Sequence, residues 1–125
     1  MTAVTLTQTP LKRRSLTLVL WMLQIVSAVL FLFAGTLKLS GAPMMVQMFV
    51  AIGFGQWFRY FTGGLEVISA VLLLVPSLAR FGALALAVTM VGAILTHLFI
   101  IGGNPAVPIA LLAATTTVAW VRSRD

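Results

Sequence analysis

The chain has 125 residues, of which 61% are hydrophobic and only 8% are charged, and its formal net charge is +6. Soluble globular domains carry about 25% charged residues, so this composition excludes the soluble class. The absence of cysteine excludes disulfides, thiolate metal sites and iron–sulfur clusters. We therefore expect an all-α integral membrane protein made of one domain, since the chain is too short for a second.

The basic residues stand at the ends of apolar runs and do not form a patch interleaved with exposed aromatic residues. This pattern indicates membrane topology and argues against nucleic acid as a partner. The sequence has no phosphate-binding glycine loop and no nucleophile elbow. With one histidine and one carboxylate inside an apolar run, we expect no metal site, no catalytic residues and no self-sufficient enzymatic activity.

Residues 1–14 are predicted to form a flexible N-terminal tail that ends in three basic residues, and residues 15–37 to form the first membrane span. One face of this span carries polar and small residues three or four positions apart, among them Gln24, Gly35 and Lys38. Such a face is expected to lie against other helices, because lipid offers polar groups no partner. Lys38 is expected near the far membrane interface.

A short apolar helix is predicted at residues 44–52, after the helix-breaking residues 40–43. It is too short to span a bilayer, so we expect it to be interfacial or re-entrant. Residues 53–60 follow, with two glycines and a cluster of aromatic residues around Arg59. This segment is interpreted as an interfacial anchor or, alternatively, as a lid over a cavity between the helices.

The second span is predicted to begin at Trp57 or Phe61 and to end at Val75, before Pro76. It contains Glu66, the only acidic residue inside an apolar run. A carboxylate in a hydrocarbon-soluble helix is energetically costly and marks a functional site by default. Thr62, Gly63 and Ser69 lie on the same predicted helical face.

The third and fourth spans are predicted at residues 79–100 and 105–121, which completes a single four-helix transmembrane domain over residues 15–121. Both spans carry small residues at helical spacing, which we expect to serve interfaces or packing: Gly82, Ala85, Thr89, Gly92, Thr96, Ala106, Ala110 and Ala113. Residues 122–125 are predicted to form a short cytoplasmic tail.

Orientation follows from the distribution of lysine and arginine. With four spans, six of the eight basic residues lie on the side of the termini: Lys12, Arg13, Arg14, Arg80, Arg122 and Arg124. By the positive-inside rule, both termini are cytoplasmic in a multi-pass protein of the cytoplasmic or inner membrane.

Depth estimates from helix rise place Glu66 about 15 Å from the cytoplasmic boundary and His97 about 25 Å from it. The ionisable groups thus gather in the outer half of the bundle, and the inner half is almost purely aliphatic. Two interpretations stay open. Glu66 is either a neutral structural group bonded to a hydroxyl, or part of an outward-opening pocket in which Lys38 or Arg59 balances its charge. The candidate ligand-binding residues are Lys38, Glu66, His97, Arg59, Gln24, Thr62 and Ser69.

Three stretches resemble the DoxX-like family of small membrane proteins. They are FLFAGTLKLSG at 31–41, FVAIGFGQWFRYFTGGLEVISAVLLLVP at 49–76 and RFGALALAVTMVGAILTHLFIIGGNP at 80–105. The resemblance extends over residues 15–121 and implies a compact four-helix bundle. It also implies that Lys38, Glu66 and His97 occupy the family's polar positions. Relatives are associated with quinone-linked sulfur oxidation, membrane redox complexes, assembly or cargo reception.

Three functions are compatible with these features. The first is a non-catalytic accessory subunit or assembly factor that binds a larger membrane complex. Independently of function, the expected partners are the lipid bilayer and either a membrane protein partner or a second copy of the chain in a homo-oligomer. The alternative is a quinone- or lipid-binding component of a membrane oxidoreductase, in which the pocket holds a polar head and the helices hold the apolar tail. The third is a small proton-coupled transporter, which the strong charge bias and the position of Glu66 in the second span disfavour.

Overall fold

A computed structural model describes residues 10–124 of the chain. In this part of the chain, five α-helices and one short π-helix follow one another, and no strand forms. They are α2 (Pro10–Ser40), α3 (Pro43–Ile52), α4 (Gln56–Leu73), α5 (Ala79–Thr96), η1 (His97–Ile101) and α6 (Ala106–Arg122). The all-helical prediction is confirmed. Two segments, Leu11–Ser40 and Ala79–Ile101, are long and apolar enough to cross a membrane.

The first helix begins earlier than the sequence predicted. Because α2 starts at Pro10, residues 10–14 are helical, whereas we had placed them in the N-terminal tail. Proline suits a first helical position, since its fixed φ is already helical and its missing N–H would have no partner there. The rest of the predicted tail, residues 1–9, lies outside the described residues.

The predicted third span also differs at its end. There the α-helix α5 stops at Thr96 and the chain continues as the π-helix η1, which begins with His97. Short π-helical turns inside helices occur frequently at functional sites. The short helix predicted at 44–52 corresponds to α3, which starts with Pro43.

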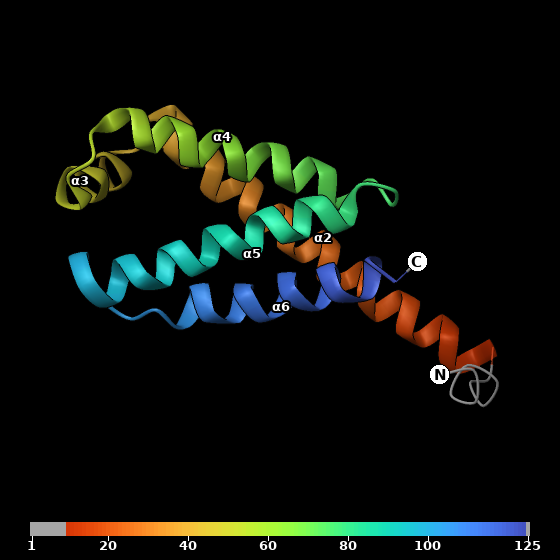
Figure 1. The fold of residues 1–125 in the computed structure, drawn as a ribbon. Helices are drawn as coiled ribbons and strands as arrows, with labels where there is room; N and C mark the ends of the chain where they lie inside the picture. The colour runs from red at the N-terminus through yellow and green to blue at the C-terminus, as the bar shows by residue number, and fades with distance from the viewer. Residues whose placement is uncertain (1–9, 125) are drawn as a thin grey trace.

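The helices are arranged as an antiparallel bundle with α3 across one end (Figure 1). Helix α5 packs extensively on both α4 and α6, whereas α2 packs extensively on α4 and makes a smaller contact with α6. The start of α2, the turn between α4 and α5, and the end of α6 lie at one end of the bundle, which we call the termini end. Helix α3 and η1 lie at the opposite end, which we call the α3 end.

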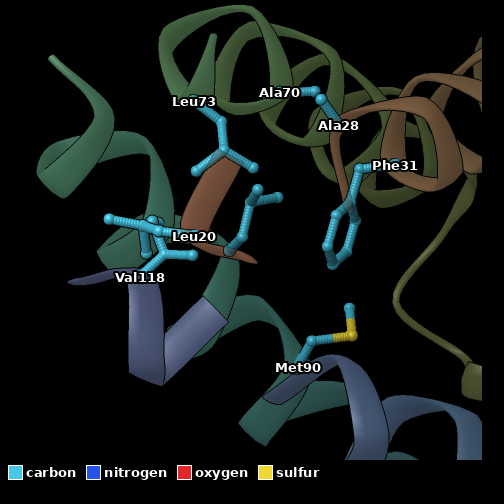
Figure 2. Packing of buried hydrophobic residues seen from close by; sticks show 9 residues of the cluster. Leu20, Ala28, Phe31, Ala70, Leu73, Met90 and Val118 are labelled. Atoms are coloured by element: carbon cyan, nitrogen blue, oxygen red, sulfur yellow. The ribbon is translucent and has the colours of Figure 1, made fainter. Parts of the chain in front are cut away.

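The core is a single cluster of buried apolar residues from α2, α4, α5 and α6. Figure 2 shows Leu20, Leu73 and Val118 grouped together, and Phe31 with its ring directed toward Met90. Many other large apolar side chains of α2 and α5 are exposed on the outside of the bundle, for example those of Phe33 and Val88. An apolar exterior of this extent is expected for helices that face lipid.

Helices α4 and α5 touch at backbone level because of Gly82. A Cβ atom on this residue would lie 2.6 Å from the carbonyl oxygen of Ser69 and 2.9 Å from the backbone nitrogen of Leu73. Backbone atoms cannot move aside as the end of a flexible side chain can, so the two helices would have to separate.

We therefore expect Gly82→Ala to destabilise the protein by about 1–3 kcal/mol, the usual effect of overpacking a core. Gly92→Ala is the matched control on the same helix, because a Cβ atom at Gly92 meets nothing within 4 Å. This control should be neutral or slightly stabilising, since alanine favours a helix over glycine. Unfolding in mixed micelles, followed by circular dichroism, measures both, and equal stability of the two variants would contradict the close approach.

Candidate functional site

A buried ion pair joins α2 to α4. The Nζ of Lys38 lies 3.1 Å from Oε1 of Glu66 and donates a hydrogen bond to Oε2 at 3.4 Å. The side chain of Glu66 is 3% exposed and that of Lys38 is 14% exposed. Burial of the Glu66 carboxylate is energetically costly, and the ammonium group of Lys38 offsets this cost by lying close to both carboxylate oxygens.

Two glycines allow the two helices to come close enough for this contact. A Cβ atom on Gly35 would lie 2.8 Å from the carbonyl oxygen of Gly63, and one on Gly63 would lie 3.0 Å from that of Gly35. A Cβ on Gly63 would also lie 2.9 Å from Cβ of Lys38, and one on Gly35 would lie 3.3 Å from Cβ of Glu66. The lysine stem therefore crosses the space that a side chain at Gly63 would fill, and Glu66 uses the space at Gly35.

Arg59 holds the end of α2 and makes no ion pair with Glu66. Its Nη1 donates to the backbone carbonyl of Lys38, and its Nε donates to Oε1 of Gln56 at 2.6 Å. The last four carbonyls of a helix have no partner within the helix, and α2 ends at Ser40. The buried guanidinium of Arg59 thus satisfies one of these carbonyls and fixes the turn that carries the lysine. The sequence left open whether Lys38 or Arg59 balances the charge of Glu66, and in the structure it is Lys38.

A cavity of about 650 Å³ lies beside the ion pair. All of the described helices, including η1, contribute to its lining. Its polar lining residues are Lys38, Thr62, Glu66, Thr89, Thr96 and His97. The remaining walls are apolar and include Met45, Met48, Phe49, Phe58 and Phe61 from α3 and α4. Small-molecule sites in proteins have this size and this combination of an apolar wall with a few polar groups.

The polar groups of the cavity differ in what they can offer a ligand. The Nδ1 of His97 lies 2.9 Å from the carbonyl oxygen of Ala93. A carbonyl can only accept, so this contact places a proton on Nδ1, and in a neutral imidazole Nε2 is then the acceptor. The hydroxyls of Thr89 and Thr96 donate to carbonyls one turn earlier, each at 2.8 Å, and keep lone pairs that can accept. Lys38 is the cationic donor of the set.

Three residues predicted to bind a ligand, Arg59, Gln24 and Ser69, do not line the cavity. Gln24 is fully buried, donates to the carbonyl of Leu73 at 2.9 Å and accepts from Nε of Arg122 at 2.8 Å. It lies fourteen residues before Lys38, which is about 21 Å along α2. The helical face was assigned correctly, but the distance along the helix places Gln24 in a second polar cluster toward the termini end. Ser69 is buried one turn beyond Glu66.

This second cluster was missed because Arg122 had been assigned to the cytoplasmic tail. In the structure Arg122 is the last residue of α6, and its guanidinium also lies 5.2 Å from the ring centroid of Trp21. A signal was present in the sequence. Arg122 follows the buried Thr115 and Val118 at helical spacing, so it continues the inward face of α6.

The small residues predicted for interfaces or packing lie in four different environments. Gly82 is buried against α4, while Thr89, Gly92 and Thr96 line the cavity and Ala85 is half-buried. The three alanines of α6, Ala106, Ala110 and Ala113, are exposed on the outside of the bundle. In residues 10–124, no three histidine, aspartate or glutamate side chains gather as a metal ion would require.

A family model described as the DoxX-like family matches residues 22–120, a range that includes every residue lining the cavity. No curated protein and no solved structure matches the chain.

If Lys38 and Glu66 form a buried ion pair, the effects of their substitutions on the free energy of unfolding should not be additive. Removing one partner of a buried pair leaves the other charge uncompensated, so Lys38→Met and Glu66→Gln should each destabilise the protein by about 2–5 kcal/mol. The double variant should lose less than the sum of the two single variants, because neither charge remains. Unfolding of the four proteins in mixed micelles measures the coupling free energy between the two side chains. Arg14→Gln removes an exposed cation from the same helix and serves as the control for loss of charge alone. Strictly additive losses would show that Lys38 and Glu66 do not interact.

Proposed function

This chain belongs to the DoxX-like family, and we propose on that premise that it is a four-span membrane protein whose cavity binds a lipophilic molecule with a polar head. The proposal places this binding in a non-catalytic accessory component of a larger membrane complex. The observation that carries it is an ion pair in the wall of a cavity that is otherwise mostly apolar.

The length of the helices supports four spans. Besides the two long apolar helices, α4 has 18 residues and α6 has 17. At 1.5 Å per residue these are about 27 and 26 Å long, close to the roughly 30 Å of bilayer hydrocarbon. Four antiparallel spans bring the six basic residues at the start of α2, the start of α5 and the end of α6 to one side. The positive-inside rule makes that side cytoplasmic.

Reporter fusions after residues 40, 78, 103 and 125 test this topology. We expect a cytoplasmic signal at 78 and 125, and a signal from the opposite side at 40 and 103. Residues 40 and 103 lie at the α3 end, where the chain carries only Lys38 and Arg59 as basic residues. A cytoplasmic signal at either of these two positions would rule out the proposed orientation.

The chemistry of the cavity supports an amphipathic ligand. Lys38 can donate to a carbonyl or hydroxyl oxygen, while Glu66 and Nε2 of His97 can accept from a hydroxyl. The methionines and phenylalanines of α3 and α4 provide an adaptable apolar wall for a tail. A quinone or a lipid combines such a polar head with such a tail.

Native mass spectrometry of protein purified in mild detergent tests the ligand. We expect a co-purified lipophilic molecule in the wild type, with occupancy reduced about tenfold or more by Glu66→Gln, because a hydrogen bond to a charged group contributes about 1.5–3 kcal/mol and tenfold corresponds to about 1.4 kcal/mol. His97→Ala removes a neutral acceptor that contributes about 0.5–1.5 kcal/mol, so it should reduce occupancy about two- to tenfold. Gln24→Ala is the matched control, since it removes a buried polar group outside the cavity and should leave occupancy unchanged. Unchanged occupancy in both cavity variants would refute the ligand site.

The accessory role is supported by the outer face of α6. Its exposed alanines, with the exposed Thr117, form a surface on which a second membrane helix could approach closely. The same spectra report on this role, because a stoichiometric protein partner adds a defined mass to the complex. A homo-oligomer alone would count against an accessory subunit and would leave the ligand site standing.

A further inference from the structure

A second hollow lies between α5 and α6 at the termini end, and the proposed function does not use it. It is a groove of about 320 Å³ and shares no lining residue with the cavity beside Glu66. Its lining residues are Arg80, Phe81, Leu84, Thr116, Ala119, Trp120 and Ser123. One end of the groove is therefore cationic and aromatic, and the rest is mostly apolar.

Two arginines are positioned by aromatic rings of this groove. The guanidinium of Arg80 lies 4.8 Å from the ring centroid of Phe81, and that of Arg124 lies 5.8 Å from the ring centroid of Trp120. Contacts of this kind with a ring face are favourable for a cation. Both arginines are exposed, so their N–H groups are accessible to a ligand from outside the bundle.

Among the described residues, every charged side chain at the termini end is basic: Lys12, Arg13, Arg14, Arg80, Arg122 and Arg124. Asp125, the one acidic residue that follows them in the sequence, lies outside the described residues. In residues 10–124 the single carboxylate is that of Glu66, which pairs with Lys38. The groove therefore complements an anion with an attached apolar chain.

We infer that this groove binds one anionic phospholipid. Its phosphate lies between Arg80 and Arg124, and one acyl chain lies along Leu84, Thr116 and Ala119. Trp120 occupies the level of the membrane interface, where tryptophan is enriched. Basic pockets between membrane helices on the cytoplasmic side select anionic head groups over zwitterionic ones. The inference rests on the proposed membrane topology and is independent of the proposed ligand of the cavity.

The test uses the full-length, delipidated protein in detergent. It is incubated with equal amounts of phosphatidylglycerol and phosphatidylcholine that have identical acyl chains, and bound lipid is counted by native mass spectrometry. We expect the wild type to retain phosphatidylglycerol preferentially. The double variant Arg80→Gln/Arg124→Gln should lose this preference. Each arginine near an anionic lipid contributes about 1 kcal/mol, so each substitution should lower the affinity for phosphatidylglycerol about fivefold.

Two further variants separate the groove from general charge. Arg13→Gln/Arg14→Gln removes the same charge from the same end, but from the exposed start of α2, and should keep the preference. Thr116→Trp keeps every charge and fills the groove, because Thr116 lines it and is exposed, so bound phosphatidylglycerol should decrease. Circular dichroism confirms that each variant is folded.

Three outcomes would overturn the inference. They are equal retention of the two lipids by the wild type, an equal loss in the Arg13/Arg14 control, and full retention in Thr116→Trp. Glu66→Gln alters the cavity and leaves the groove intact, so it should keep the lipid preference. If Glu66→Gln abolished retention and the groove variants did not, the lipid would belong to the cavity. Failure here and failure of the cavity proposal are thus distinguishable.

Discussion

The structure depends on burying the carboxylate of Glu66 in the interior of the bundle. Removing Glu66 and Lys38 from water is costly, and their attraction repays that cost only when the geometry is close. The glycines at positions 35 and 63 supply this geometry, because they let α2 and α4 meet at their backbones. Arg59 then fixes the last turn of α2 by binding the carbonyl of Lys38. The crossing of α2 and α4, and with it the wall of the cavity, follows from this requirement.

The bundle has two polar clusters separated by the apolar core. At the α3 end, Lys38 and Glu66 lie at the cavity, where a ligand can reach them. Toward the termini end, Gln24 is fully buried and joins the end of α4 to the end of α6 through Leu73 and Arg122. Lys38 and Glu66 line the cavity, whereas Gln24 is packed among protein atoms and hydrogen-bonded to Leu73 and Arg122. This difference is why we assign binding to the first and a structural role to the second.

Much of the site could be found in the sequence because membranes restrict polar residues severely. A single acidic residue in an apolar run identifies Glu66, and helical periodicity places Lys38 and Gln24 on the inner face of α2. Periodicity gives direction around a helix and says little about which neighbour is met at which depth. Gln24 was therefore assigned to the wrong cluster, and Arg122, at the boundary of a predicted tail, was missed. The role of Arg59 also depends on the carbonyl of Lys38 in the last turn of α2, which can be identified only once the end of that helix is defined.

The all-helical class, the approximate helix boundaries and the identity of the buried carboxylate follow from the amino-acid sequence, since these depend on composition and on local spacing. That Lys38 and not Arg59 faces Glu66 follows from the packing of the helices. The same packing decides that the alanines of α6 point outward and that a cavity remains beside the pair. These facts depend on the distance between helix backbones, which is set where residues far apart in the chain, such as Gly35 and Gly63, come into contact.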